Sequence, residues 1–158
     1  MVTHNPTALD WLRKAKFKIQ GKWIPDPNTG LPQLKWKRES DPDNQRQAVY
    51  AFVTEYRILY VGKAAAKKGG LKGLAQRMRT YEKGSHKEGR HEQNMRSRIT
   101  QKLKQSPISV WAHMPDEDDA TVPYGDLPFG INIVAGLETT MINRFDPPWN
   151  AGSNKEEL

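Results

Sequence analysis

The chain has 158 residues, a hydrophobic share of 36%, a net charge of +7 and no cysteine. One domain of this length has enough apolar content for a core, which argues against a wholly disordered protein. The lack of cysteine excludes a disulfide framework and thiolate metal sites, and it fits a cytoplasmic location. No apolar run is long enough to span a bilayer, and residues 1–17 lack the apolar centre of a secretory signal. We therefore expect no membrane partner.

The positive charge is concentrated between residues 63 and 104. This segment holds thirteen basic and three acidic residues, a net charge of +10, so the rest of the chain carries −3. A local excess of this size creates a positive field that attracts polyphosphates. Two solvated helix faces are the alternative explanation, but the size of the excess favours a nucleic acid as the partner.

Residues 1–45 read as an N-terminal arm. Thr7 is a candidate cap for a helix whose apolar positions recur at helical spacing: Leu9, Leu12, Ala15 and Ile19. The sequence PDPNTG follows between apolar positions and predicts either a short hairpin or an extended loop. The polar sequence ESDPDNQ then reads as a linker.

The stretch AVYAFVTEYRILYVGKA, residues 48–64, predicts a β-hairpin. Its two halves are rich in β-forming residues and flank the polar turn 54–57. Each half carries a tyrosine within an apolar run, Tyr50 in the first and Tyr60 in the second. Lys63 follows Tyr60 by three residues, across a glycine that lets the backbone approach a ligand closely.

Two helices and a strand are expected after the hairpin. The first helix places Leu74, Met78 and Tyr81 on one face, together with Leu71, and puts Arg77 one turn before Tyr81. The second helix has its apolar residues in register at Met95, Ile99 and Leu103. Residues 107–114 alternate between apolar and polar positions, which predicts a strand.

An acidic, proline-rich segment at 115–130 predicts a surface loop. A last helix follows and is expected to stop at Pro147-Pro148. The order of the elements predicts an α/β fold, with a small three-stranded antiparallel or mixed sheet flanked by helices.

Glu138 interrupts the apolar stripe of the last helix. It lies one turn after Val134 and about one turn before Met141. An ionised carboxylate on a packed face is costly unless it is paired or binds a metal. An ion pair with an arginine, an edge position reaching solvent, and a divalent-cation site all fit this residue. Mg²⁺ often takes only one or two carboxylates and completes its shell with water and substrate phosphate.

Tyr50 and Tyr60 have a packing explanation and a chemical one. Tyrosine is common in strands because it packs well on a pleated surface. A phenol has an ordinary pKa near 10, so a tyrosine acting as a base near neutral pH needs positive charge or a metal-bound water nearby. Lys63 and Arg77 are the candidates for that charge.

Together these features resemble the GIY-YIG nuclease family. That family has a hairpin with a Gly-Ile-Tyr and a Tyr-Ile-Gly triplet about ten residues apart, matched here by Ala48-Val49-Tyr50 and Tyr60-Val61-Gly62. The first triplet keeps only its tyrosine. The later family motifs are matched in order by Arg77 with Tyr81, Glu138 and Asn150. The sequences YVGKA and DPPWN look most like the type II restriction endonucleases of the family.

The resemblance covers residues 46–152, the expected nuclease domain, and leaves 1–45 as the arm and 153–158 as a polar tail. It implies a DNA endonuclease that depends on a divalent metal and hydrolyses phosphodiester bonds, within a restriction system. Glu138 would hold Mg²⁺ or Mn²⁺, which stabilises the leaving 3′ oxygen and the scissile phosphate. Arg77 would neutralise charge developing on the phosphoryl oxygens.

The resemblance also assigns roles to the remaining site residues. Tyr50 is the first choice for the general base that activates water, assisted by Lys63, and Tyr60 is the alternative. Tyr60 and Tyr81 would otherwise position water or phosphate. Asn150 would fix Tyr50 or the local backbone.

Double-stranded DNA is the implied substrate. The side chains expected to contact it are Lys67, Lys68, Lys72, Arg79, His86, Arg90, His91, Arg96 and Arg98. The arm would read sequence or form a homodimer. Two alternative functions stay open: a non-catalytic nucleic-acid-binding module on the same fold, and a phage or repair nuclease without strict sequence specificity.

Overall fold

The computed structural model describes residues 6–38, 46–55, 57–64, 73–83, 90–115, 121–124, 127–130 and 133–150. Its elements in chain order are α1 (Pro6–Lys14), β1 (Lys18–Pro25), β2 (Pro32–Trp36), β3 (Ala48–Val53), β4 (Ile58–Ala64), α2 (Gly73–Lys83), α3 (Arg90–Leu103), β5 (Ile108–His113), β6 (Thr121–Tyr124), β7 (Leu127–Gly130) and α4 (Ile133–Phe145). The hairpin, the two helices after it, the strand and the last helix all occur where the sequence predicts them. No described helix is long and apolar enough to cross a membrane.

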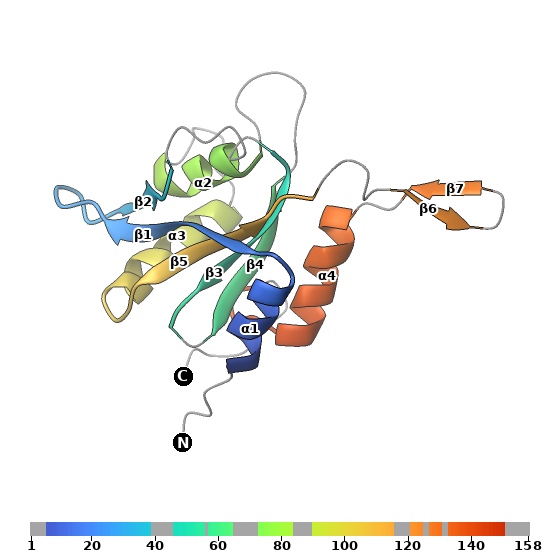
Figure 1. The fold of residues 1–158 in the computed structure, drawn as a ribbon. Coiled ribbons are helices and arrows are strands. Elements are labelled where there is room, and N and C mark those ends of the chain that lie inside the picture. Colours follow the sequence, from blue (N-terminus) through green and yellow to red (C-terminus); the bar gives the residue numbers. More distant parts are fainter. Residues whose placement is uncertain are drawn as a thin grey trace.

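The main sheet has five antiparallel strands in the order β2-β1-β5-β3-β4 (Figure 1). The prediction of three strands is therefore wrong, because the arm contributes two more. Trp23 and Leu34, on β1 and β2, are both buried in the same apolar cluster as the central strands. This shared burial explains why β1 pairs with β5 rather than standing apart. The predicted domain boundary at residue 46 stays a prediction, and the sheet extends across it.

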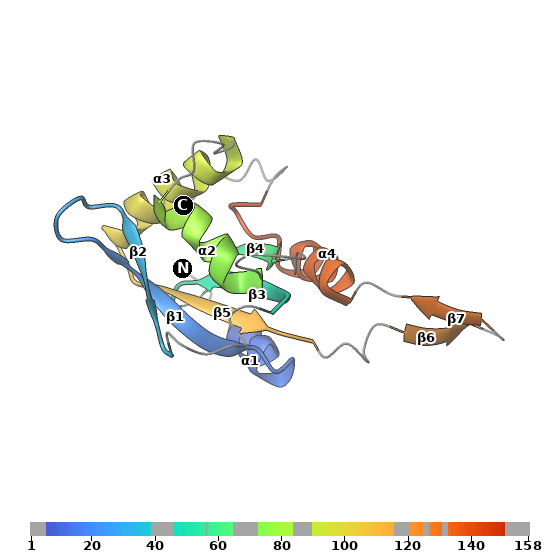
Figure 2. The same cartoon turned by 90° about the horizontal axis from the view of Figure 1, so that it is seen from above.

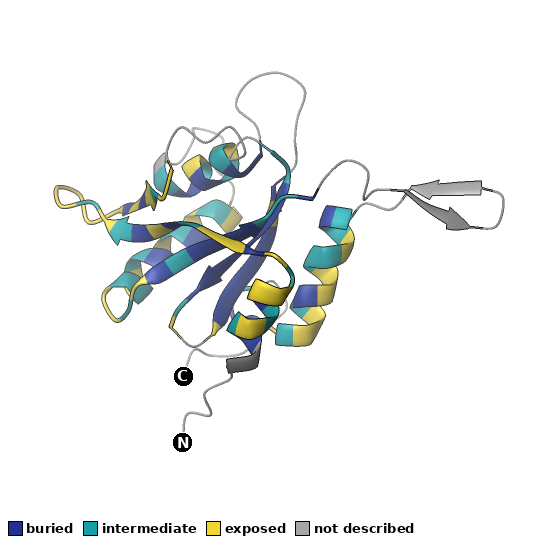
Figure 3. Cartoon of the chain, in the orientation of Figure 1, coloured by how far each residue is buried: buried dark blue, intermediate teal, exposed yellow. Residues whose placement is uncertain are grey.

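Helices cover both faces of the sheet. Leu74, Met78 and Ile99 place α2 and α3 on one face, within the cluster that contains Tyr50 and Phe52. Leu12 of α1 and Met141 of α4 belong to the second cluster, on the opposite face. Figure 2 shows α2 and α3 on one side of the sheet, α1 on the other and α4 beside β4. Every residue of β3 is buried (Figure 3). A strand covered on both faces needs a continuous apolar run, which accounts for AVYAFV.

The end of α1 has an unusual backbone. The amide of Lys16 donates to the Arg13 carbonyl at 3.0 Å, and the amide of Phe17 donates to the Leu12 carbonyl at 2.9 Å. These two bonds form a Schellman motif, in which the residue at the position of Lys16 adopts a left-handed conformation. Lys16 has a φ of 64°, where a side chain costs about 1–2 kcal/mol relative to glycine. The helix therefore ends before Ile19, which lies on β1 and not on the predicted helical stripe.

The acidic segment at 115–130 contains a hairpin rather than only a surface loop. Its strands β6 and β7 pair from Thr121↔Gly130 to Tyr124↔Leu127, and they extend away from the body of the molecule (Figure 1). The dipeptide Gly125-Asp126 between the two strands is a sequence signal for a tight hairpin. The prolines and acidic residues of the segment favour a loop, so the sequence predicted a surface loop and not a hairpin.

Candidate active site

Tyr50 of β3 lies in the middle of the site and faces α2. Its side chain is 0% exposed, and its neighbour across the hairpin is Gly62 of β4. A Cβ atom at position 62 would lie 2.5 Å from both Cζ and Oη of Tyr50 and 2.9 Å from Cε1 of Tyr60. The glycine of the second triplet therefore provides the space that the Tyr50 phenol occupies.

We expect Gly62→Ala to destabilise the fold by about 2 kcal/mol, because the added methyl group overpacks a buried ring. The melting temperature should fall by about 4–8 °C. Gly136→Ala is the matched control, since a Cβ there has no atom within 4 Å and replacing glycine inside a helix stabilises by about 0.5–1 kcal/mol. Thermal melts of both variants check the prediction, and shifts of the same sign would contradict it.

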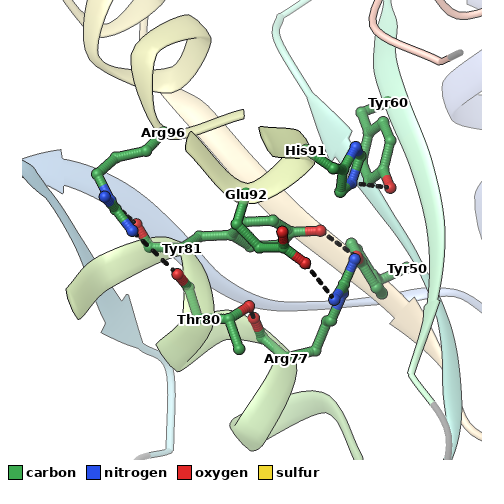
Figure 4. Close-up of polar contacts among 8 residues, drawn as sticks. All are labelled: Tyr50, Tyr60, Arg77, Thr80, Tyr81, His91, Glu92 and Arg96. Atoms are coloured by element: carbon green, nitrogen blue, oxygen red, sulfur yellow. Dashed lines mark hydrogen bonds and ion pairs between the residues drawn. The ribbon is translucent and has the colours of Figure 1, made fainter. Parts of the chain in front are cut away.

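A hydrogen-bonded cluster surrounds the Tyr50 hydroxyl (Figure 4). Its oxygen is 2.8 Å from the Tyr81 hydroxyl, and Nε of Arg77 donates to it at 3.4 Å. Arg77 also forms an ion pair with Glu92 of α3 at 3.3 Å, and its guanidinium lies 5.2 Å from the centre of the Tyr81 ring. Arg77 is one turn before Tyr81 on α2, so both side chains reach the same point on β3.

The electrostatics of this cluster keep the Tyr50 phenol protonated. Burial raises the pKa of Tyr50 well above its ordinary value of 10.0, and the neighbouring phenols of Tyr81 and Tyr60 raise it further. The positive charge of Arg77 lowers the pKa but does not cancel these effects. The positive charge that lowers the pKa of Tyr50 comes from Arg77. Lys63 contacts Glu138 instead. The expectation that Lys63 lowers the pKa of Tyr50 therefore finds no support in the geometry.

Tyr60 of β4 has a different partner. Its hydroxyl lies 3.3 Å from Nε2 of His91 on α3, and the two rings are 5.9 Å apart. Partial burial of the imidazole and the nearby charge of Arg77 lower the pKa of His91. The unprotonated nitrogen of a neutral imidazole can accept a hydrogen bond from the phenol. The sequence placed His91 among the DNA contacts, whereas the structure brings it to a tyrosine of the site.

Glu138 reaches the site from the other side of β4. Lys63 and Gly62 point to opposite faces because side chains alternate along a strand, and the Lys63 ammonium lies 3.9 Å from Oε1 of Glu138. The Glu138 side chain is 21% exposed and the Lys63 side chain 50%. Burial raises the pKa of Glu138, while Lys63 and Arg77 act in the opposite direction. The carboxylate is thus half-buried within the field of both cations.

Asn150 holds the outer edge of β4. Its Oδ1 accepts from the Val61 amide at 3.0 Å, and its Nδ2 donates to the Val61 carbonyl at 2.8 Å. The Trp149 amide donates to the Leu59 carbonyl at 3.0 Å, and Arg98 donates to the Trp149 carbonyl at 2.9 Å. The segment after α4 therefore fixes the strand that carries Tyr60 and Gly62.

Comparison with known proteins places the fold. No protein-family model matches the chain, and no curated protein matches it. Among solved structures, a mutant of bacteriophage T4 EndoII is similar with a TM-score of 0.63 and 20% identity, covering 90% of this chain and 97% of the EndoII chain. The chain has the fold of EndoII. Restriction endonuclease HPY188I in complex with product DNA gives a TM-score of 0.48 at 15% identity, over 95% of this chain and 83% of that one.

The residues expected to contact DNA occupy several kinds of position on this EndoII-like fold. Arg79 and Arg90 are exposed, whereas Arg96 donates to the carbonyls of Tyr81 at 2.9 Å and Thr80 at 3.2 Å, at the end of α2. Arg96 therefore helps to join α3 to α2. Arg98 is exposed as well and donates to the Trp149 carbonyl, and His91 contacts Tyr60. Four residues of this group lie outside the described part of the chain: Lys67, Lys68, Lys72 and His86.

A divalent cation fits the site through one carboxylate. Within the described ranges, no group of three or more His, Cys, Asp or Glu side chains could hold a metal. Glu138 is a hard oxygen donor, partly solvated and paired with Lys63, and a carboxylate of this kind suits Mg²⁺ when water and phosphate oxygens supply the other ligands.

Two residues of the site were missed at the sequence level. Glu92 is the acidic residue in the first turn of α3, and nothing in the sequence links it to Arg77 on another helix. Gly62 was read only as a flexible position that admits a ligand, whereas it accommodates the Tyr50 ring. A search for acidic residues isolated within the basic segment would have found Glu92.

Proposed function

We propose that this chain is a DNA endonuclease of the GIY-YIG type that depends on a divalent metal and acts as a type II restriction enzyme. The convergence of Tyr50, Arg77 and Tyr81 in one hydrogen-bonded cluster carries the proposal. The Lys63–Glu138 pair lies on the neighbouring strand and helix. The fold shared with bacteriophage T4 EndoII supports the proposal. The +10 segment provides the field that attracts double-stranded DNA.

In this proposal the chain's own residues hold and polarise the scissile phosphate. Glu138 would hold Mg²⁺ or Mn²⁺, and the ion would supply charge stabilisation for the leaving 3′ oxygen. Arg77 directs its positive charge at the phosphoryl oxygens, held in place by Glu92 and by the Tyr50 hydroxyl. Asn150 keeps β4 fixed while the substrate binds.

The phenolate of one of two tyrosines accepts the proton of the attacking water. Tyr50 is our first choice because its hydroxyl contacts Arg77, whose charge favours the phenolate. Burial opposes that ionisation, so Tyr50 acts only once further positive charge enters the site. Tyr60 is the second choice, because its hydroxyl lies next to Nε2 of His91, which can accept a hydrogen bond from it.

Incubation of supercoiled plasmid DNA with the chain, in Mg²⁺, in Mn²⁺ and in EDTA, tests the function. We expect discrete fragments with either metal and none in EDTA. A smear would indicate a nuclease without sequence specificity. A gel shift with no cleavage under any metal would exclude the catalytic proposal.

A non-catalytic DNA-binding module on the same fold is the second candidate. The complete burial of Tyr50 favours it, since the hydroxyl is hydrogen-bonded to Tyr81 and Arg77 inside the protein. If this second candidate is correct, the tyrosine cluster only stabilises the core, and the protein binds the plasmid without cutting it.

A further inference from the structure

A basic cavity of about 450 Å³ lies at the end of the sheet, and its described lining includes none of the residues of the tyrosine cluster. It is formed by the start of β1, the chain after β2, the chain before β3 and the end of β5. Its cationic or titratable lining residues are Lys16, Lys18, Lys37, Arg38, Arg46 and His113. None of the described residues that line it is acidic. Positive charge from three separate segments is thus gathered around one hollow, and His113 of β5 completes the lining.

The backbone around the cavity is held in place by hydrogen bonds. Lys18 pairs with Ala112 across β1 and β5, and the Lys37 amide donates to the Gln20 carbonyl at 2.8 Å. Arg46 donates from Nη2 to the carbonyls of Met114 at 3.4 Å and Pro115 at 3.1 Å. The cavity therefore has a defined shape in the folded chain.

Lys16 provides a second, independent observation. It occupies the left-handed position at the end of α1, where glycine is strongly favoured, yet its side chain lines the cavity. A strained residue that persists at a site is a reason to look for a function there. A cation at this position adds charge to the cavity at the expense of stability.

We propose that this cavity binds the phosphate backbone of duplex DNA next to the cleavage position, an inference that rests on the proposed endonuclease function. Arg46 is four residues before Tyr50, so their Cα atoms are no more than about 14 Å apart, which corresponds to about four base pairs of duplex. Ile19, 43% exposed, also lines the cavity and offers an apolar surface to a deoxyribose ring. The arm thereby takes part in DNA binding through its charge.

A pair of double variants of the full chain tests the cavity. Lys18→Ala/Lys37→Ala removes two cavity lysines, and Lys22→Ala/Lys35→Ala removes two exposed lysines that pair across β1 and β2 but do not line it. Fluorescence anisotropy with a labelled duplex in EDTA gives binding without cleavage. We expect the cavity variant to bind at least about tenfold more weakly, and its log K against log salt slope to fall by roughly 2. The control should change affinity less than about twofold.

Equal affinities of wild type and cavity variant would overturn the inference, and so would equal losses in both double variants. These results differ from failure of the proposed function, in which wild type binds the duplex but never cuts plasmid. If wild type bound no duplex at all, both the inference and the proposed function would fall.

Lys16→Gly separates a binding role from a structural one. We expect its melting temperature to rise by about 2–4 °C, because glycine relieves the strained backbone. Its affinity for the duplex should fall several-fold, because one cavity charge is lost. A lower melting temperature, or an unchanged affinity, would overturn the role assigned to Lys16.

Discussion

Glu138→Ala is expected to lower the rate of DNA cleavage about a thousandfold, the equivalent of about 4 kcal/mol of lost transition-state stabilisation. Glu138 is the only carboxylate described beside the Lys63 ammonium at the site, and its loss removes the proposed metal ligand. Affinity for a duplex in EDTA should stay the same or increase, because a negative charge is removed from a surface that binds a polyanion. Plasmid cleavage and anisotropy measure the two effects separately.

The stability of the same variants shows whether unfolding explains a loss of activity. Burial raises the pKa of Glu138, so the folded chain keeps this proton to a higher pH than the unfolded chain does. Ionisation therefore destabilises the fold as pH rises through the interval between the two pKa values. Glu138→Gln removes that cost, and we expect its melting temperature at pH 7 to equal or exceed that of wild type.

Glu55→Ala serves as a control, because it removes an exposed carboxylate from the turn between β3 and β4. It should leave cleavage unchanged. Full activity of both Glu138 variants would remove this residue from the proposed mechanism.

Tyr50→Phe is expected to lower the cleavage rate at least about a hundredfold, the usual size of a general-base contribution. The variant also leaves Arg77 and the Tyr81 hydroxyl without their shared partner. This should destabilise the fold by about 1–2 kcal/mol. Single-turnover cleavage measured across a pH range, with binding measured in EDTA, checks the prediction.

Tyr60→Phe is the matched variant on the facing strand. If Tyr50 is the base, Tyr60→Phe keeps the wild-type pH profile of the cleavage rate. The cleavage rate of Tyr50→Phe then no longer rises with deprotonation of a tyrosine. The reverse pattern would assign the base to the Tyr60–His91 pair. If both variants cleave at the wild-type rate, neither phenol takes part in the chemistry.

Local patterns predicted the elements of the fold but not all of its pairings. The β-forming runs around Tyr50 and Tyr60 predicted the hairpin, and helical spacing placed Leu74 and Met78 on the buried face of α2. The pairing of β1 with β5 joins segments about ninety residues apart, which no local periodicity encodes. The arm was therefore read as separate from the sheet that it completes.

Short sequence motifs predicted those parts of the site that lie within one helix or one hairpin. Arg77 and Tyr81 share a helix face, so their spacing alone brings them together. The contacts of Arg77 with Glu92 and of Tyr60 with His91 depend on how α3 packs against the sheet and α2. The basic cavity depends on four distant segments, of which three carry one or two ordinary lysines or arginines and the fourth carries His113. Such features follow from tertiary packing and have no sequence signature of their own.

The bonds from Asn150 to Val61 have a consequence for assembly. β4 is an edge strand of the main sheet, and an unpaired edge can recruit a strand from another molecule. The Asn150 amide occupies the outward-facing groups of Val61 in the way that an added strand would. The opposite edge, β2, begins with Pro32 and carries the exposed Lys35, both of which discourage strand addition. We therefore expect two copies of this chain not to associate by joining their sheets.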